Sequence, residues 1–459
     1  MSAGPQRRSN TSRGRGADGD SRSATPPAPA LDYPLIGILA TLLALGLVMV
    51  YSASVIQVGA QFFLSQILWI VLGTGVLIAM ACIPFRLWQS LAIPVMAVAL
   101  LALAAVLIFG DDRFGARRTL FNGRVQPSEF AKLAVVIYVA AWVASKGKKL
   151  TEVEGGLVPF SILMGLVTAL IVLEPSFSVA IITLAIGVVI FFVGGADIRQ
   201  LLIAAIVAAV VLAVLLLQSH YGVDRIHGWW ATLSDPSQAS YQTSQAMQIL
   251  RRGDGIGTTP DNWLEKANVP LLWSDYLFAN IGHDLRFPGT VGVVALYAAL
   301  GYRGLGIALK ASDRFGALMA IGITTWILSQ AAIHMGASLA LIPTTGQPLP
   351  FMSYGGSAML SCMAAMGLLL SIARASTDKK AAYARFALGG RDGGPRLPDS
   401  GRGERPEDAK PTAREGYATA GSKKTDPDRK DAESRRSVKR KPAPRLEQSI
   451  ERKRLERRG

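Results

Sequence analysis

Long apolar segments constrain this chain more than any other feature of its sequence. Between residues 34 and 373 it is built largely from runs of Leu, Val, Ile and Ala that contain few charged residues. A run of about 20 such residues can span the hydrocarbon core of a bilayer as an α-helix, because a helix satisfies its backbone hydrogen bonds within itself. The sequence therefore predicts an all-α polytopic membrane protein.

The spacing of the apolar runs predicts ten spans within a transmembrane domain at 31–375. Polar tails at 1–30 and 376–459 flank this domain, and their low apolar content predicts disorder. The first run has spanning length and follows a long polar tail, so we expect it to remain as an anchor. The spans are expected near residues 34–55, 62–83, 87–109, 128–145, 157–173, 177–194, 198–217, 288–309, 315–342 and 352–373.

The basic residues beside the spans indicate the orientation of the chain, because cytoplasmic loops carry an excess of Lys and Arg. With the N-terminus inside, this excess falls on the inner loops, at Arg86, Lys146, Lys148, Lys149, Arg199, Arg303, Lys310, Arg314 and Arg374. Ten spans then return the C-terminus to the cytoplasm. The outer segments are 110–127, 343–351 and the large loop 218–287, between the seventh and eighth spans.

The composition of the chain argues against several classes of function, among them nucleic-acid binding and ATP-driven transport. Most of the formal net charge of +16 comes from the tails, so we expect the C-terminal tail to meet anionic lipids or a cytoplasmic partner, and not nucleic acid. Cys82 and Cys362 lie inside predicted spans and are expected to be packing residues. The four histidines form no metal-ligand cluster. The sequence also has no phosphate-binding glycine loop, which argues against an ATP-driven pump.

The outer segment 110–127 has two interpretations. Its arginines stand on the side where the charge rule disfavours them, and a guanidinium suits an anionic ligand such as a phosphate. Alternatively, they pair with Asp111, Asp112 or lipid head groups. The arginines are Arg113, Arg117, Arg118 and Arg124.

Glu129 and Lys132 follow Pro127 and are three residues apart, so they project from one face at the outer end of a helix. They either form an internal ion pair, or Lys132 reaches a phosphate while Glu129 orients it.

The large outer loop carries several polar residues, among them Arg225 and Asp275. Tyr241, Gln242 and Gln245 suit either the hydroxyls of a sugar or ordinary interfacial anchoring. Asp275 follows Trp273 and precedes Tyr276 and Phe278. If these rings desolvate its carboxylate, its pKa rises and it becomes a better proton acceptor. Alternatively, Asp275 faces solvent or caps a helix that begins near Tyr276.

Several of these stretches together resemble the SEDS (FtsW/RodA/SpoVE) family of membrane glycosyltransferases, and its cell-division branch more than its elongation branch. The resemblance covers roughly residues 35 to 374. It is carried by LVMVYSAS (47–54), GARR (115–118), QPSEFAKLA (126–134), SDYLFA (274–279) and TTGQPLPFMSYGGS (344–357). Ten spans with one large outer loop are also this family's architecture.

The resemblance implies a peptidoglycan glycosyltransferase that polymerises lipid II into glycan strands at the outer face of the cytoplasmic membrane. It implies that Asp275 is the general base, and that Arg118, Arg124 and Lys132 serve the diphosphate leaving group. The other expected substrate-binding residues are Glu129, Arg225, Gln242, Gln245, Ser353 and Gly355. A divalent cation, Mg or Mn, is a further candidate, although the sequence shows no self-sufficient site for one.

The family also implies a division-site location and several partners. These are a class B penicillin-binding protein, which is a transpeptidase, other membrane proteins of the division complex, and the surrounding lipids.

The chain departs from the family pattern around Asp275. Leu271 and Trp273 replace an acid and an imidazole, His283 and Asp284 replace two glutamates, and Ser176 replaces an acid after Glu174-Pro175. Residues 258–263 replace a glycine-rich stretch. Two alternatives therefore stay open, a flippase for lipid II or another polyprenyl-linked sugar, and a catalytically degenerate division scaffold.

Overall fold

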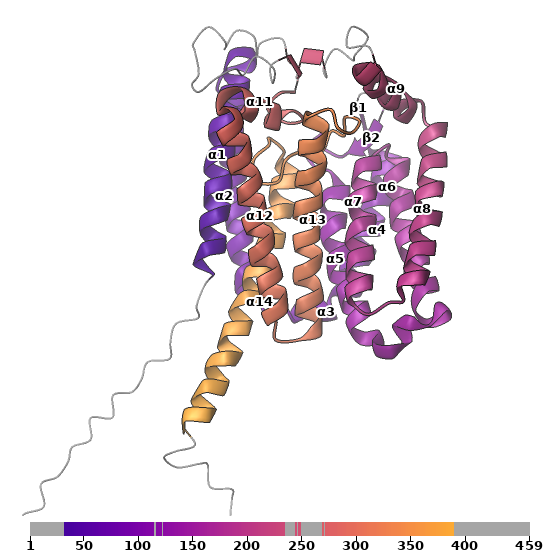
Figure 1. Ribbon diagram of the computed structural model, residues 1–459, viewed down its shortest axis with the longest axis vertical. Helices are drawn as coiled ribbons and strands as arrows, with labels where there is room; N and C mark the ends of the chain where they lie inside the picture. Colours follow the sequence, from indigo (N-terminus) through magenta and orange to yellow (C-terminus); the bar gives the residue numbers. More distant parts are fainter. Residues whose placement is uncertain are drawn as a thin grey trace, which may run out of the picture. The chain divides into compact units, whose positions relative to one another are not determined.

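The computed structural model describes residues 32–113, 116–121, 123–234, 244–245, 247–248, 269 and 271–389 (Figure 1). They lie in one unit that ends at Gly394. The long helices are α1 (Tyr33–Val58), α2 (Gln61–Cys82), α4 (Ala92–Phe109), α5 (Pro127–Lys146), α6 (Val158–Leu173), α7 (Phe177–Val193), α8 (Ile198–Gln218), α12 (Arg286–Lys310), α13 (Arg314–Ser338) and α14 (Gly356–Gly389).

Shorter elements join these helices. Helix α3 (Leu87–Ser90) precedes α4, and a 3₁₀ turn (Gly147–Thr151) and a π-helical turn (Val153–Leu157) lead into α6. The antiparallel hairpin of β1 (Asp111–Arg113) and β2 (Ala116–Thr119) follows α4. Helices α9 (His220–Ser234) and α11 (Leu277–Asp284) belong to the large loop.

The prediction of an all-α multi-pass membrane protein is confirmed. In the described part of the chain, nine helices are long and apolar enough to cross a membrane. Helix α7, with 17 residues, lies at the lower limit of about 17 for a span. The count of ten spans stays a prediction, with α7 as its shortest member.

Two helices differ from their predicted bounds. The span expected from residue 87 is broken at Leu91 into α3 and α4, which places Pro94 in the first turn of α4, where its missing N–H costs no hydrogen bond. Helix α14 begins at Gly356, later than the expected 352, and continues to Gly389, into the segment predicted as a tail. This extension contains several Ala and Lys residues, which favour helix.

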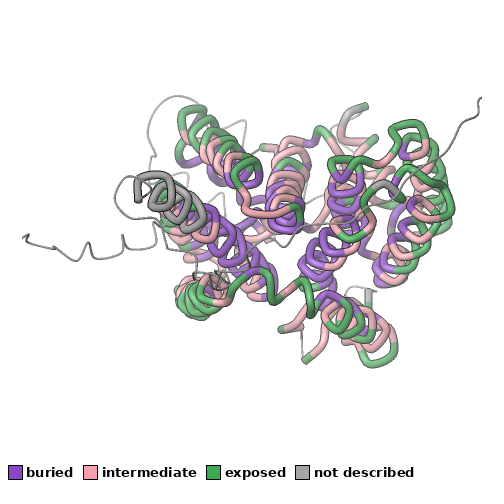
Figure 2. The backbone as a smooth tube through the Cα atoms, turned by 90° about the horizontal axis from the view of Figure 1, so that it is seen from below, coloured by how far each residue is buried: buried purple, intermediate pink, exposed green. Residues whose placement is uncertain are grey.

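The helices differ in how far they are enclosed by protein. In α14, 83% of the spanning window is buried, and in α5 72%, whereas in α8 only 6% is buried. Figure 2 looks along the helices and shows buried residues on inward faces and exposed residues on outward faces. The outward residues include apolar side chains such as Leu202, Ile206 and Val210 on α8. An exposed apolar exterior of this kind suits a lipid environment.

Loops gather at two opposite ends of the bundle (Figure 1). At one end Arg86 forms an ion pair with Asp313, with Nε and Oδ2 2.9 Å apart, and Arg314 donates to the Gly194 carbonyl. The other end holds the hairpin, α9 and α11. The structure thus separates basic loops predicted as inner from segments predicted as outer.

Gly46 allows α1 to approach the segment that precedes α14. A Cβ atom added at Gly46 would lie 2.5 Å from the Cα of Met352, a backbone atom that cannot turn aside. Gly37 on the same helix is exposed, and a Cβ there would meet nothing within 4 Å. Gly46 is therefore required by packing, whereas Gly37 is not.

We predict that Gly46→Ala destabilises the protein by about 1–3 kcal/mol, the usual cost of overpacking. Gly37→Ala is the matched control, and its effect is expected to be neutral or slightly stabilising because alanine favours helix. Thermal unfolding of the purified protein in detergent measures both. Equal unfolding midpoints for Gly46→Ala and wild type would contradict the close contact between α1 and Met352.

Candidate functional site

Asp275 ends a tight turn at residues 271–275. Its backbone N–H donates to the Leu271 carbonyl at 2.9 Å, and the Ser274 hydroxyl donates to the same carbonyl at 3.3 Å. Leu271 has a φ of 56°, in the left-handed region that a leucine rarely adopts. Helix α11 begins two residues after Asp275, with Tyr276 as its N-cap, so Asp275 is not the cap.

Aromatic and backbone contacts fasten this turn to its neighbours. The Trp273 ring stacks on Phe62 at the start of α2, with centroids 4.9 Å apart, and Phe62 meets Tyr354 edge to face at 4.7 Å. The Tyr354 N–H donates to the Trp273 carbonyl at 3.0 Å. Trp273 therefore ties the turn that carries Asp275 to the segment before α14.

Arg225 and Arg118 supply positive charge near the Asp275 carboxyl group. Burial raises the pKa of Asp275, while a hydrogen bond with Ser274 and the charges of Arg225 and then Arg118 lower it by less. A Cβ atom added at Gly346 would lie 3.6 Å from Nη2 of Arg225 and 3.8 Å from Oδ2 of Asp275. Gly346 has a φ of 63°. Three segments far apart in sequence thus meet beside this glycine.

Helix α9 holds residues 340–346 at this point. Nη1 of Arg225 donates to the Thr344 carbonyl at 2.6 Å, and Nε1 of Trp229 donates to the Ala340 carbonyl at 2.8 Å. Arg225 therefore has two roles in the geometry, because it fixes the turn that contains Gly346 and brings a charge to Asp275.

The hairpin and the residues after it carry the other two arginines predicted to bind the substrate. Arg118 lies on β2 and is half-buried, whereas Arg124, after the hairpin, is exposed. The Arg124 carbonyl accepts a hydrogen bond of 3.0 Å from the Ser357 hydroxyl at the start of α14. Asp111, which the alternative interpretation paired with these arginines, accepts from the Gly123 N–H at 3.0 Å.

Glu129 and Lys132 form the internal ion pair that one sequence interpretation predicted. Nζ of Lys132 lies 2.9 Å from Oε1 of Glu129 and 2.7 Å from Oε1 of Gln330 on α13. The ammonium also lies over the Trp326 ring, 5.1 Å from its centroid. Both members of the pair are at most 1% exposed. Lys132 is therefore enclosed by protein in this structure.

The sequence did not predict the partners of this pair. Nε2 of Gln330 donates to the Pro348 carbonyl at 2.9 Å, and Nδ1 of His334 lies 2.7 Å from the Gln347 carbonyl. These contacts tie α13 to the 344–351 segment. The only sequence signal was polar residues four apart inside an otherwise apolar span.

The remaining predicted residues have varied positions. Ser353 is buried, and its hydroxyl accepts from the Leu349 N–H at 3.0 Å, so it closes the turn itself. The Gly355 carbonyl accepts from the Met359 N–H at 2.9 Å, which starts α14. Gln245 is half-buried. Tyr241, Gln242 and residues 258–263 lie outside the described residues.

Glu174 is a buried acid that sequence reasoning did not place in the site. It lies between α6 and α7, is 0% exposed, and neither carboxyl oxygen accepts a hydrogen bond within the described part of the chain. Burial raises its pKa to about 8, and a weaker interaction with the Ser128 hydroxyl lowers it by less. The sequence signal was an acid before a proline between two spans.

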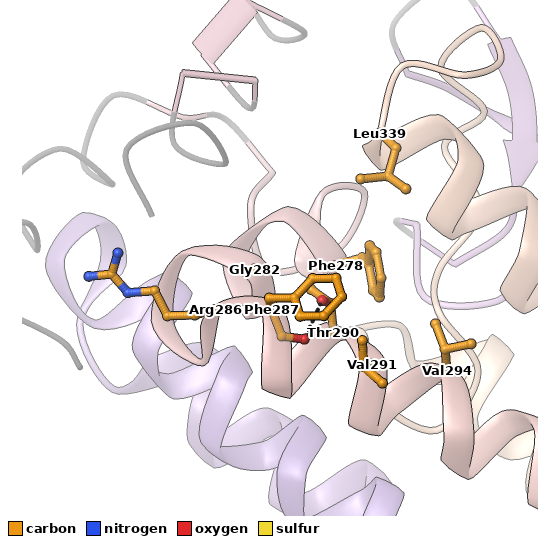
Figure 3. Close-up of a pocket in the computed structure, with 8 residues that line it drawn as sticks. All are labelled: Phe278, Gly282, Arg286, Phe287, Thr290, Val291, Val294 and Leu339. Atoms are coloured by element: carbon orange, nitrogen blue, oxygen red, sulfur yellow. Dashed lines mark hydrogen bonds between the residues drawn. The ribbon is translucent and has the colours of Figure 1, made fainter. Parts of the chain in front are cut away.

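A cavity of about 500 Å³ lies beside α11 and the outer half of α12 (Figure 3). Its lining is mostly apolar and includes Phe278, Gly282, Phe287 and Val291, while the Arg286 side chain points away from the others. Asp275 is not among the lining residues. The described residues contain no group of three His, Cys, Asp or Glu that could hold a metal ion.

Comparisons with known proteins relate the chain to one family. The family model described as "Cell cycle protein" (FtsW/RodA/SpoVE) matches residues 33–378. A probable peptidoglycan glycosyltransferase FtsW of Nitrosomonas europaea is 34% identical over 363 residues, which cover 76% of this chain and 94% of that protein. A protein of the same name from Pseudomonas fluorescens is 31% identical over 357 residues, with 74% and 88% covered.

Solved structures agree with these sequence relatives. A chain of a peptidoglycan synthase complex, described as coordinating polymerization and crosslinking, superposes with a TM-score of 0.65 at 25% identity and covers 76% of this chain and 98% of its own. The rod shape determining protein RodA of Thermus thermophilus gives 0.58 at 26% identity, with 75% and 97% covered.

We predict that Glu174→Gln changes stability in a pH-dependent way. Because the folded pKa of Glu174 is about 8, against an ordinary 4.5, its contribution to stability is present below pH 4.5 and is lost as the pH rises to 8. The free energy of unfolding of the variant, relative to that of wild type, should therefore rise between pH 4.5 and pH 8. The rise should be at most about 1.4 kcal/mol for each pH unit, and the difference should stay constant at higher pH.

Thermal unfolding in detergent at pH 5 and pH 8 measures this difference. The control is Glu154→Gln, since Glu154 is exposed. A difference between Glu174→Gln and wild type that does not vary with pH would show that Glu174 is not buried as described.

Proposed function

The chain belongs to the FtsW/RodA/SpoVE family of cell cycle proteins, and on that premise we propose that it is a peptidoglycan glycosyltransferase that polymerises lipid II during cell division. Its FtsW relatives are named as probable peptidoglycan glycosyltransferases, and the chain spans about nine-tenths of their length or more. The observation that carries the proposal at the residue level is the half-buried Asp275 carboxyl group, which lies near Arg225 and is influenced by the charges of Arg225 and Arg118.

Asp275 acts as the general base. Its carboxylate takes the proton from the 4-hydroxyl of the acceptor sugar, whose oxygen attacks the anomeric carbon of the donor. The bond from that carbon to the undecaprenyl diphosphate breaks, so the configuration inverts and the diphosphate leaves with the bonding electrons. The raised pKa makes Asp275 a stronger base, and the two arginines limit the rise so that the carboxylate still forms.

Arg118, Arg124 and Arg225 bind the substrate's diphosphate. Negative charge grows on this group as the bond breaks, and a guanidinium already in place stabilises the transition state more than the ground state. Gln242 and Gln245 are proposed to bind sugar hydroxyls, and Ser353 and Gly355 to shape the turn beneath the substrate.

Glu129 and Lys132 support the site from within. Their pair holds Gln330, which bonds to Pro348, two residues from the Gly346 that adjoins Asp275. We therefore assign them to positioning the 344–351 segment, and a direct contact between Lys132 and the diphosphate would require the pair to separate.

A divalent cation, Mg or Mn, would bind only in company with the substrate's diphosphate. The described residues offer no protein cage for it, and cations of this kind often rely on substrate phosphates for part of their coordination. No step of the mechanism above passes through the metal.

The cellular setting follows from the family. We propose that both termini are cytoplasmic, that the site faces outward, and that the protein works at the division septum with a class B penicillin-binding protein. The similarity to a chain of a complex that joins polymerization to crosslinking supports such a partner. Other division proteins and membrane lipids complete the proposed surroundings.

A scaffold without activity is the second candidate. It is favoured by the turn itself, because Leu271 and Trp273 bring no polar side-chain partner to Asp275 and Leu271 holds a strained φ of 56°. A flippase is less favoured, since the buried charges Glu129 and Lys132 neutralise each other.

We predict that Asp275→Ala lowers glycan polymerisation by at least about 100-fold, the usual contribution of a general base. The assay uses purified protein, with and without its transpeptidase partner, and labelled lipid II. The matched control is Asp224→Ala, because Asp224 is an exposed acid on α9 beside Arg225. Strand synthesis undiminished in Asp275→Ala would overturn the proposal, and inactive wild type would favour the scaffold.

We also predict that Arg225→Ala moves the acid limb of the pH–rate profile to higher pH. The positive charge of Arg225 lowers the pKa of Asp275, so its loss raises that pKa and more alkaline solution is needed to ionise the base. Arg225→Lys keeps the charge and should move the limb less. The profile is measured as kcat against pH. If its acid limb is unchanged in Arg225→Ala, the charge of Arg225 does not influence Asp275.

A further inference from the structure

The outer end of α1 forms three polar contacts with the chain around Asp275. The Met49 carbonyl accepts from Nδ2 of Asn280 at 3.2 Å, and the Ser52 hydroxyl donates to Oδ2 of Asp284 at 2.5 Å. One turn later, Nε2 of Gln57 donates to the Val269 carbonyl at 2.9 Å. The stretch LVMVYSAS, to which the function above gives no role, supplies the first two of these contacts.

These contacts stand on both sides of Asp275 in the sequence. Val269 precedes it, and Asn280 and Asp284 follow it on α11. A segment fixed at both ends to one helix has little freedom between them, so a shift of α1 against α11 would move the turn at residues 271–275. The position of the carboxylate is thus coupled to α1.

Helix α11 has two different faces. Phe278 and Gly282, four residues apart, line the cavity of Figure 3. Asn280 and Asp284, also four apart, face α1. The polar contacts on the second face therefore join α11 to α1, in addition to the packing of Phe278 in the core.

Asp284 is the charged member of this contact. Its carboxyl group is buried, and it receives the Ser52 hydroxyl on one oxygen while Nδ1 of His283 lies 2.8 Å from the other. A buried carboxylate depends on such donors, and removing one leaves the group under-bonded. Ser52 therefore helps α1 to fix the end of α11.

We propose that the outer end of α1 positions the general base, and that Ser52, through Asp284, is a positioning residue for Asp275. This inference rests on the proposed function. Ser52 touches no reacting atom in this scheme, and its effect is on the placement of the carboxylate against the acceptor hydroxyl.

The test compares Ser52→Ala with Ser54→Ala. Ser54 is two residues further along α1, is 0% exposed, and its hydroxyl makes no hydrogen bond within the described residues. Both variants delete one hydroxyl from one helix. We expect Ser52→Ala to lower kcat about tenfold or more, since small misplacements of a reacting group cost up to about 100-fold, with KM for lipid II unchanged. Ser54→Ala should match wild type.

Two further measurements separate positioning from stability. Ser52→Thr retains the hydroxyl and should restore most of kcat, and the rates of all variants are divided by the folded fraction, determined from thermal unfolding and size-exclusion profiles. A drop in kcat that disappears after this correction would overturn the inference.

Equal corrected rates for Ser52→Ala and Ser54→Ala would also overturn it, provided that Asp275→Ala is inactive in the same assay. If Asp275→Ala is fully active, the proposed function itself fails. The two failures are therefore distinguishable.

Discussion

The structure depends on one constraint, that polar groups enclosed among apolar helices need partners inside the protein. The segment at 339–355 has no regular secondary structure, and several of its backbone carbonyls are satisfied by side chains of other elements. Its carbonyls accept hydrogen bonds from Arg225, Trp229, Tyr297, Gln330 and Ser178. These donors come from α7, α9, α12 and α13. The segment therefore links these four helices to one another through its backbone carbonyls.

The proposed site uses this same segment. Gly346 lies beside both Arg225 and Asp275, since a Cβ atom added there would lie 3.6 Å from Nη2 of Arg225 and 3.8 Å from Oδ2 of Asp275, and Tyr354 bonds to the backbone of the turn that carries Asp275. This turn also packs on α2, because the Trp273 ring stacks on the Phe62 ring. The carboxylate therefore does not stand on a free loop. It is held between a satisfied irregular segment on one side and α1 on the other.

The sequence was informative about parts of this arrangement and silent about others. Apolar run lengths predicted the helices, and the spacing of Glu129 and Lys132 placed both on one face of a helix. The meeting of Arg225 with Asp275 could not be predicted, because it depends on where α9 lies across the 340–346 segment. The burial of Glu174 was hidden for a similar reason, since burial is a property of the packed bundle.

The burial of the Glu129–Lys132 ion pair restricts which substitutions these two positions can accept in evolution. Each charge is enclosed, so replacing one alone would leave the other unneutralised at a cost of about 3–5 kcal/mol, whereas a neutral pair of similar volume would be tolerated. Selection therefore acts on the two positions as a unit. Across related chains they should change together or not at all, and the amide at Gln330, which completes the shell of the ammonium, should follow them.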